Sequence, residues 1–196
     1  MPNLDRRAII WALSLAMTSL MSCGLPPLDT GDQEEAATSS AQDRTPCFVT
    51  RVFDGDTLAC DLNNNRRIES PGEHVRLLGI DAPETSHSAK LKHRLKPGQA
   101  PYDEPYAQEA TRMLQSLALR HTVYLAWDVE RVDRYGRSLA VIYPGAGSQA
   151  SLNEALLKAG VVKTLFFPPN LAYAKRFRAA QKEARRARVG LWQSAR

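Results

Sequence analysis

The chain has 196 residues, 43% of them hydrophobic, with 26 Lys and Arg against 21 Asp and Glu. Residues 1–46 hold six of the acidic and three of the basic side chains, which leaves 23 basic and 15 acidic residues in 47–196. Those 150 residues are enough for one domain with a real core and argue against several. A domain this basic suits a polyanion or an anionic surface, although charge alone identifies neither.

The N-terminus has the pattern of an export signal. Two arginines precede the apolar run Ala8–Met21, which has the length of a signal-peptide core and is too short to span a membrane comfortably. The run ends in Leu20-Met-Ser-Cys23, which resembles the lipobox of bacterial lipoproteins. We therefore expect a signal peptide over 1–22 and a lipid anchor on Cys23, as in an exported cell-envelope lipoprotein of the periplasm or cell surface. An ordinary cleaved signal with an incidental cysteine is the alternative.

A tether is predicted next, over 23–46, because this segment is rich in Ser, Thr, Pro, Asp and Glu and has almost nothing to bury. The domain then covers 47–196. It contains Cys47 and Cys60, which an oxidising compartment would favour as a disulfide. If a hairpin turn centres on Gly55, the two are about two residues out of register, so a bulge would have to absorb the difference. Two free thiols are the alternative.

The domain begins with strand signals and continues with alternating helices and strands. Strands are expected at Phe48–Phe53, Leu58–Leu62, Val75–Ile80, Thr122–Val129 and Ser138–Tyr143. Helices are expected at Asp103–Arg120, Ser151–Ala159 and Asn170–Arg188. The second has the capping-box pair Ser151 and Glu154. Five strands with helices after the third and the fifth predict a small β-barrel flanked by three helices, an α+β domain. Residues 85–102 lack periodicity and are expected to form a long surface loop.

Two acidic motifs follow strand signals. In Val52-Phe-Asp-Gly-Asp-Thr57, Asp54 and Asp56 flank a glycine. A tight turn explains this, because Asp-Gly supplies positive φ angles; a hard-cation site is the sharper alternative. In Arg76-Leu-Leu-Gly-Ile-Asp-Ala-Pro-Glu84, Ala82-Pro83 breaks the strand, so that Asp81 and Glu84 lie at its end. These acids offer the oxygen ligands that Ca²⁺ binds.

The third motif is Asp133-Arg-Tyr-Gly-Arg137. Its Arg137, with Arg76, provides bidentate donors for a phosphate. A surface base that pairs with Asp133 is the alternative for Arg137. Together the three motifs, in this order and spacing and followed by Gly190-Leu-Trp192, resemble the staphylococcal nuclease (thermonuclease) family from about Cys47 to Trp192. The resemblance implies an OB-fold barrel and a calcium-dependent phosphodiesterase.

The resemblance also implies a metal site. Asp56 and Asp81 would be Ca²⁺ ligands, with the backbone carbonyl of Ala82 as a third, and Asp54 would support the ion from just outside. Ala82 stands where the best-known family member has threonine, a change that a carbonyl ligand tolerates.

Further roles are implied for the substrate. Glu84 would act as general base on the attacking water or orient it, while Arg76 and Arg137 would hold the scissile phosphate. Substrate contacts are implied for Asp133, Arg134, Tyr135 and Phe167: Arg134 and Tyr135 match positions near a terminal phosphate, and Phe167 stands at a base-stacking position. Leu165 occupies the other stacking position, and the 85–102 loop is longer than in the best-known member.

We therefore expect a monomeric, membrane-anchored, calcium-dependent endonuclease that cleaves DNA and RNA and leaves 3′-phosphate ends. The alternative is a non-catalytic OB-fold lipoprotein that binds single-stranded nucleic acid, since the fold alone serves many binders. Retention of all the acids and arginines of the family pattern favours the enzyme. The basic side chains of the last expected helix are interpreted as a solvated face that would raise the local concentration of nucleic acid.

Overall fold

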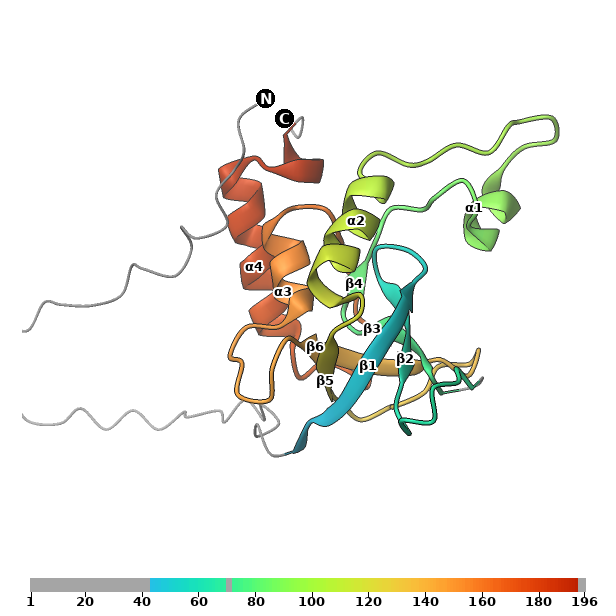
Figure 1. The fold of residues 1–196 in the computed structure, drawn as a ribbon. Coiled ribbons are helices and arrows are strands. Elements are labelled where there is room, and N and C mark those ends of the chain that lie inside the picture. Colours follow the sequence, from blue (N-terminus) through green and yellow to red (C-terminus); the bar gives the residue numbers. More distant parts are fainter. Residues whose placement is uncertain (1–42, 70–71, 194–196) are drawn as a thin grey trace, which may run out of the picture. The chain divides into compact units, whose positions relative to one another are not determined.

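The computed structural model describes residues 43–69 and 72–193 (Figure 1). The expected signal peptide, the lipidated Cys23 and the tether as far as residue 42 lie outside the described residues. Within the described ranges, no helix is both long and apolar enough to cross a membrane.

Five strands close into a barrel in the order β1-β2-β3-β6-β5. Their bounds are Thr45–Val52 (β1), Thr57–Asp61 (β2), His74–Leu77 (β3), Thr122–Ala126 (β5) and Ser138–Tyr143 (β6). Neighbours are antiparallel except β3 and β6, which are parallel, and the barrel closes where β1 pairs with β5. Apolar side chains from every strand fill the interior, among them Val49, Leu58, Val75, Leu125 and Ile142. The predicted OB-type barrel in an α+β domain is confirmed.

The barrel begins earlier in the chain than predicted. Thr45 and Pro46, assigned to the tether, pair with β5 in the closing seam of the barrel. Arg44 precedes them and stacks on Tyr143 of β6, with its guanidinium carbon 3.4 Å from the ring centre. The boundary moves because partners on distant strands order this segment, although its own composition gives it little to bury.

A disulfide joins Cys47 of β1 to Cys60 of β2, with Cα atoms 5.7 Å apart. In the ladder Val49 is the residue that faces Cys60, and the register shifts between Val49 and Arg51. The cysteines are therefore diagonal neighbours next to a bulge, and both are buried in the core.

Among the described residues, four α-helices accompany the barrel, α1 (Ala89–Arg94), α2 (Ala107–Ala118), α3 (Leu152–Lys158) and α4 (Ala174–Ala187), and a 3-10 helix, η2, follows at Gly190–Trp192. The three predicted helices are confirmed, with shorter bounds. α1 is new, because the 85–102 segment was expected to be a loop throughout. α4 starts later than predicted because Asn170 bonds the backbone of Glu130: its Nδ2 donates to the carbonyl at 2.9 Å and its Oδ1 accepts from the N–H at 2.8 Å.

α3 is fixed to the barrel and to α4 by polar contacts. Its buried Asn153 accepts a hydrogen bond from Ile142 N (3.0 Å) and donates one to Leu78 O (2.8 Å). The predicted capping box is confirmed at Ser151 and Glu154, and Glu154 also pairs with Arg176 of α4. Burial raises the pKa of Glu154, but the hydrogen bonds from Arg176 and Ser151 outweigh it and hold the pKa below its ordinary value.

The strand predicted at Val75–Ile80 is broken in two. After β3 the chain turns at Gly79, with φ of +75°, and continues as β4 (Ile80–Asp81), which pairs with β7 (Lys163–Thr164) in a separate two-stranded sheet. A Cβ at Gly79 would lie 2.8 Å from ring atoms of both Phe166 and Phe177. Close packing and a positive φ therefore both require glycine here, and the turn carries Asp81 out of the barrel wall.

Candidate active site

Arg76 is the centre of a buried charge cluster. It projects from β3, where it faces Thr57 of β2 in the ladder. Its guanidinium forms an ion pair with Asp56 through Nη1 and with Asp81 Oδ1 at 3.2 Å through Nη2. The structure thus brings together three predicted site residues from the β1–β2 turn, β3 and β4.

Asp56 is held in one orientation by further donors. Its Oδ2 accepts a hydrogen bond from Ala82 N at 2.6 Å, and its Oδ1 accepts one from the Thr57 hydroxyl at 3.0 Å. Asp54 lies beside it and accepts a bond from Asp56 N at 3.0 Å. Burial raises the pKa of Asp56 to about 6; Arg76 opposes this rise, and the carboxylate of Asp54 adds to it.

Gly55 has a different role from the one predicted. Its φ lies outside the positive range, so the expectation that Asp-Gly supplies positive φ angles is wrong. Instead, a Cβ at this position would lie 2.5 Å from Ala110 Cβ of α2 and 2.8 Å from Ala82 Cβ. The glycine lets the turn pack directly on α2, which fixes the acids on either side of it.

The acids around Arg76 have the chemistry of a hard-cation site. Asp54, Asp56, Asp81 and the Ala82 carbonyl offer oxygen alone, which suits Ca²⁺. Over residues 43–69 and 72–193, no three His, Cys, Asp or Glu side chains form a ready metal-binding group. With two carboxylates as direct ligands, solvent would have to supply most of the roughly six to eight oxygens that Ca²⁺ takes.

Glu84 is tied to α1 on two sides. The Ser88 hydroxyl donates to Glu84 Oε2 and also caps α1 by accepting from Leu91 N at 3.4 Å. Glu104 accepts from Glu84 N, donates its own N–H to Glu84 O, both at 2.9 Å, and forms an ion pair with Arg94 of α1. Neither partner of Glu84 was predicted from the sequence. Serine directly before Ala-Lys-Leu is an N-cap signal that could have indicated Ser88.

Arg137 is oriented by Asp133, four residues earlier. The carboxylate of Asp133 accepts from Arg137 Nε at 2.8 Å and Arg137 N at 3.0 Å, and pairs with Nη2 at 2.7 Å. Partial burial raises the pKa of Asp133, but these hydrogen bonds outweigh it, so the pKa lies below its ordinary value. Asp133 therefore holds Arg137 in place, and the contact with substrate that the sequence predicted for it stays a prediction.

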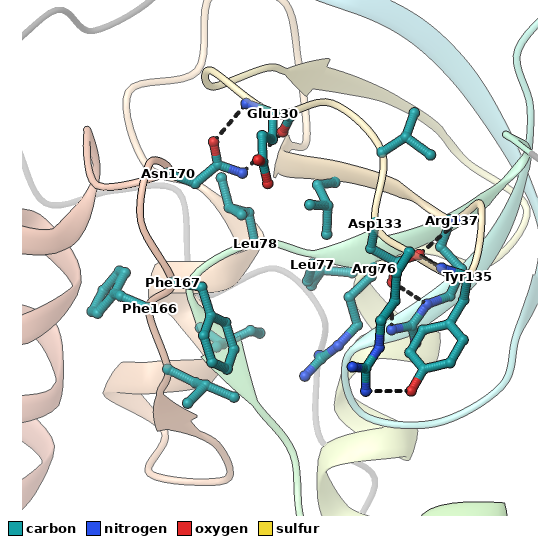
Figure 2. Close-up of a pocket in the computed structure, with 16 residues that line it drawn as sticks. Arg76, Leu77, Leu78, Glu130, Asp133, Tyr135, Arg137, Phe166, Phe167 and Asn170 are labelled. Atoms are coloured by element: carbon teal, nitrogen blue, oxygen red, sulfur yellow. Dashed lines mark hydrogen bonds and ion pairs between the residues drawn. The ribbon is translucent and has the colours of Figure 1, made fainter.

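A pocket of about 690 Å³ lies next to the acidic cluster, but Glu84 and the acids Asp54, Asp56 and Asp81 do not line it. Arg76 and Arg137 both line it, with Arg134, Tyr135, Leu165 and Phe167 among the other lining residues. Figure 2 shows Arg76 reaching into it between Phe167 on one side and Tyr135 on the other. Arg76 thus belongs both to the pocket wall and to the acidic cluster.

The rim of the pocket is aromatic on both sides. Phe167 and Tyr135 are about equally exposed, at 70% and 68%, and Arg134 Nη2 donates to the Tyr135 hydroxyl at 2.6 Å. The segment that carries Phe167 is fixed by Asn170, whose paired bonds to Glu130 close one end of the pocket (Figure 2). Nothing in the sequence near Asn170 indicated this pair of hydrogen bonds, because Glu130 lies 40 residues away.

Comparisons with known proteins find related nucleases. Residues 74–194 match the family model described as "Staphylococcal nuclease homologue". The thermonuclease of Staphylococcus hyicus is 31% identical over 164 residues, which cover 84% of this chain and 85% of the relative. The thermonuclease of Staphylococcus intermedius is 33% identical over 74% of this chain and 75% of its own. Endonuclease YncB of Bacillus subtilis (strain 168) is 30% identical over 74% of this chain and 60% of its own.

Proposed function

The chain belongs to the staphylococcal nuclease family and is a nuclease, and we propose that it is a calcium-dependent endonuclease that hydrolyses both DNA and RNA. The observation that carries this proposal is the double placement of Arg76, which lines the pocket with Arg137 and is ion-paired to Asp56 and Asp81. A phosphodiester held by both arginines would lie next to the acidic cluster.

The arginines address the main obstacle to the reaction. A phosphodiester is already anionic and repels a hydroxide-like nucleophile, so positive groups must face the oxygens on which charge grows. Arg76 and Arg137 are planar donors suited to two such oxygens at once. Arg137 arrives pre-oriented by Asp133, which reduces the reorganisation needed when substrate binds.

Glu84 is the residue we propose to activate water. Its carboxylate would accept a proton as the water oxygen bonds to phosphorus, and the bond to the 5′ oxygen would break, leaving a 3′-phosphate and a 5′-hydroxyl that takes a proton from solvent. Ser88 fixes one carboxylate oxygen. Asp56, Asp81 and the Ala82 carbonyl would hold Ca²⁺, with Asp54 alongside. A calcium ion in such a site polarises the phosphoryl oxygen and orients the attacking water.

The proposal is tested by cleavage of single-stranded DNA and RNA by the purified protein, in Ca²⁺ and in a calcium chelator, beside Glu84→Gln and Arg137→Ala. We expect the wild-type protein to cleave both substrates in Ca²⁺ and neither in the chelator. Each of the two substitutions should strongly lower the cleavage rate in Ca²⁺. Glu109→Gln and Arg112→Ala are matched controls, because these side chains pair with each other on the exposed face of α2, and both variants should cleave normally. Tight binding without cleavage in any divalent ion would indicate the non-catalytic binder instead.

The ends of the products test the direction of cleavage separately. We expect fragments that phosphatase must treat before a polymerase can extend them, since a 3′-phosphate blocks extension. Fragments that extend directly would contradict the proposed 3′-phosphate product and leave the nuclease activity intact.

A lipid anchor on Cys23 is a further part of the proposal, supported by Leu20-Met-Ser-Cys23 after an apolar run. It would hold a monomeric nuclease at the cell envelope, in the periplasm or at the cell surface. We expect Cys23→Ala to move the protein from the membrane fraction to the soluble fraction; membrane association that survives the substitution would contradict the anchor.

A further inference from the structure

One face of α4 is strongly basic. The other face of α4 is buried and includes Phe177, Ala180 and Ala184. The exposed basic residues of the opposite face are Lys175, Arg178, Lys182, Arg185 and Arg186. We call these five the basic ridge. From Lys175, steps of three, four and three residues place the next three members on one side of the helix, and Arg186 lies there too, four residues after Lys182. The structure describes all of α4, and its one acidic residue, Glu183, pairs with Lys158 at 3.1 Å.

Two arginines of the basic ridge are held on aromatic rings. The guanidinium carbon of Arg178 lies 5.2 Å from the centre of the Phe166 ring, and that of Arg185 lies 4.2 Å from the Trp192 ring. A guanidinium that rests on a ring keeps its N–H edge available to a phosphate and has less freedom to lose on binding. The two arginines are two helical turns apart, about 10 Å along the helix axis.

The basic ridge is continuous with the pocket. Phe166, which supports Arg178, is also one of the pocket-lining residues. β7 joins α4 to the acidic cluster. Thr164 N donates to Gln181 Oε1 of α4 at 2.8 Å, while Lys163 faces Asp81 in the strand ladder. A strand that leaves the pocket past Phe166 therefore meets Arg178 first.

We propose that the basic ridge is a second binding surface for the nucleic-acid strand, one that holds the phosphates of nucleotides outside the pocket. This inference rests on the proposed function, because it needs a strand bound at the pocket. An anionic lipid surface would also attract the charges, but continuity with the pocket through Phe166 favours the substrate. The ridge would strengthen binding of long strands and leave very short ones unaffected.

The test is the salt dependence of binding. Single-stranded DNA of about 16 nucleotides, the upper end of the site sizes bound by one OB barrel, is titrated in chelator against the full-length protein and the variant R178Q/K182Q/R185Q. Removing one cation that neutralises a phosphate of a single strand lowers the slope of log K against log salt by about 0.7, so we expect a fall of about 2. A second variant, K175Q/K182Q, leaves both aromatic contacts in place and should lower the slope by about 1.4.

A charge-matched variant removes the trivial explanation that lower net charge weakens binding. R67Q/K96Q/R112Q also removes three exposed cations, from other surfaces, and should keep the wild-type slope. Cleavage of a strand of about 4 nucleotides, the lower end of the same range, in Ca²⁺ should be equal in all variants. If R178Q/K182Q/R185Q and R67Q/K96Q/R112Q have equal slopes of log K against log salt, the proposal is overturned, even when the short strand is cleaved.

Two other results separate the alternatives. Loss of binding to phosphatidylglycerol vesicles by R178Q/K182Q/R185Q, with an unchanged DNA slope, would assign the ridge to lipid and overturn the proposal. Failure of the wild-type protein to cleave single-stranded DNA of either length in Ca²⁺ would instead contradict the proposed function, while a ridge-dependent slope would still support a nucleic-acid surface.

Discussion

The packing of Gly55 predicts whether substitution by alanine stabilises or destabilises the protein. In an open position with ordinary φ, Gly→Ala stabilises a protein by about 0.4–1 kcal/mol because it restricts the unfolded chain. At Gly55 the new Cβ would lie 2.5 Å from Ala110 Cβ and 2.8 Å from Ala82 Cβ. Neither neighbour can rotate away, because a Cβ is fixed to its backbone. Overpacking of this kind typically costs about 1–3 kcal/mol, so we expect Gly55→Ala to be destabilising.

The assay is urea unfolding of the metal-free protein, with the midpoint compared at constant m. Gly147→Ala is the matched control, because its Cβ would meet nothing within 4 Å and its φ is also outside the positive range. The control should be neutral or slightly stabilised. Thermal unfolding should move by roughly 2–4 °C for each kcal/mol in a protein of this size.

A double-mutant cycle tests the cause. Ala110→Gly alone should cost about 1 kcal/mol in a helix, but together with Gly55→Ala it removes the shorter of the two clashes. The pair should therefore be more stable than the sum of the single changes predicts, with a coupling of at least about 0.5 kcal/mol. Stabilisation by Gly55→Ala, or strict additivity, would refute the idea that the turn packs directly on α2.

Three further predictions concern residues that support the site or the core. Asp133→Ala removes the carboxylate that orients Arg137, so we expect kcat for DNA cleavage to fall by about 10- to 100-fold with a smaller change in KM, and a wild-type kcat would count against this role. Ser88→Ala removes the hydroxyl bonded to Glu84 and should lower kcat, while Ser88→Thr retains wild-type behaviour and Ser86→Ala serves as the control in the same loop. The folded-state pKa of Glu154 lies below 4.5, so its ion pair and capping bonds stabilise the protein above that pH and lose their effect as the pH falls. Glu154→Gln should cost about 1 kcal/mol of unfolding free energy at neutral pH and progressively less below about 4.5; an equal cost at all pH values would contradict the assignment.

Local patterns predicted most of the barrel and its helices. Ser138–Tyr143 was placed at its observed bounds because a short continuous apolar run carries its own signal. The break of the third strand was missed, since it depends on Phe166 and Phe177, about 90 to 100 residues from the glycine that packs on them. α1 was missed for a different reason: it has six residues and one buried side chain that is described, Leu91, so it has no periodicity to detect.

The same distinction between local patterns and contacts of distant residues applies to the candidate site. The sequence predicted the acids and the arginines, since their spacing in three motifs is local. It could not predict which of them share a partner. The pairing of Arg76 with both Asp56 and Asp81 follows from the ladder between β2 and β3 and from the turn at Gly79. Asp133 was assigned to the substrate, with a pairing to Arg137 as the alternative, because the sequence alone does not show which of these contacts the loop geometry makes.

Arg76 shows why this cluster is costly to fold and useful to keep. Even with the guanidinium alongside, burial holds the pKa of Asp56 at about 6, so ionising that carboxylate in the folded protein is unfavourable relative to water. Ordinary selection for stability would replace such a buried pair with apolar side chains, which often stabilise a protein at no cost to its fold. The turn at Gly55, the hydrogen bond from Ala82 and the break at Gly79 all serve instead to keep these charges in place. These constraints hold an unfavourable charge arrangement in place, which supports the proposal that its acids bind a cation and that Arg76 binds a phosphate.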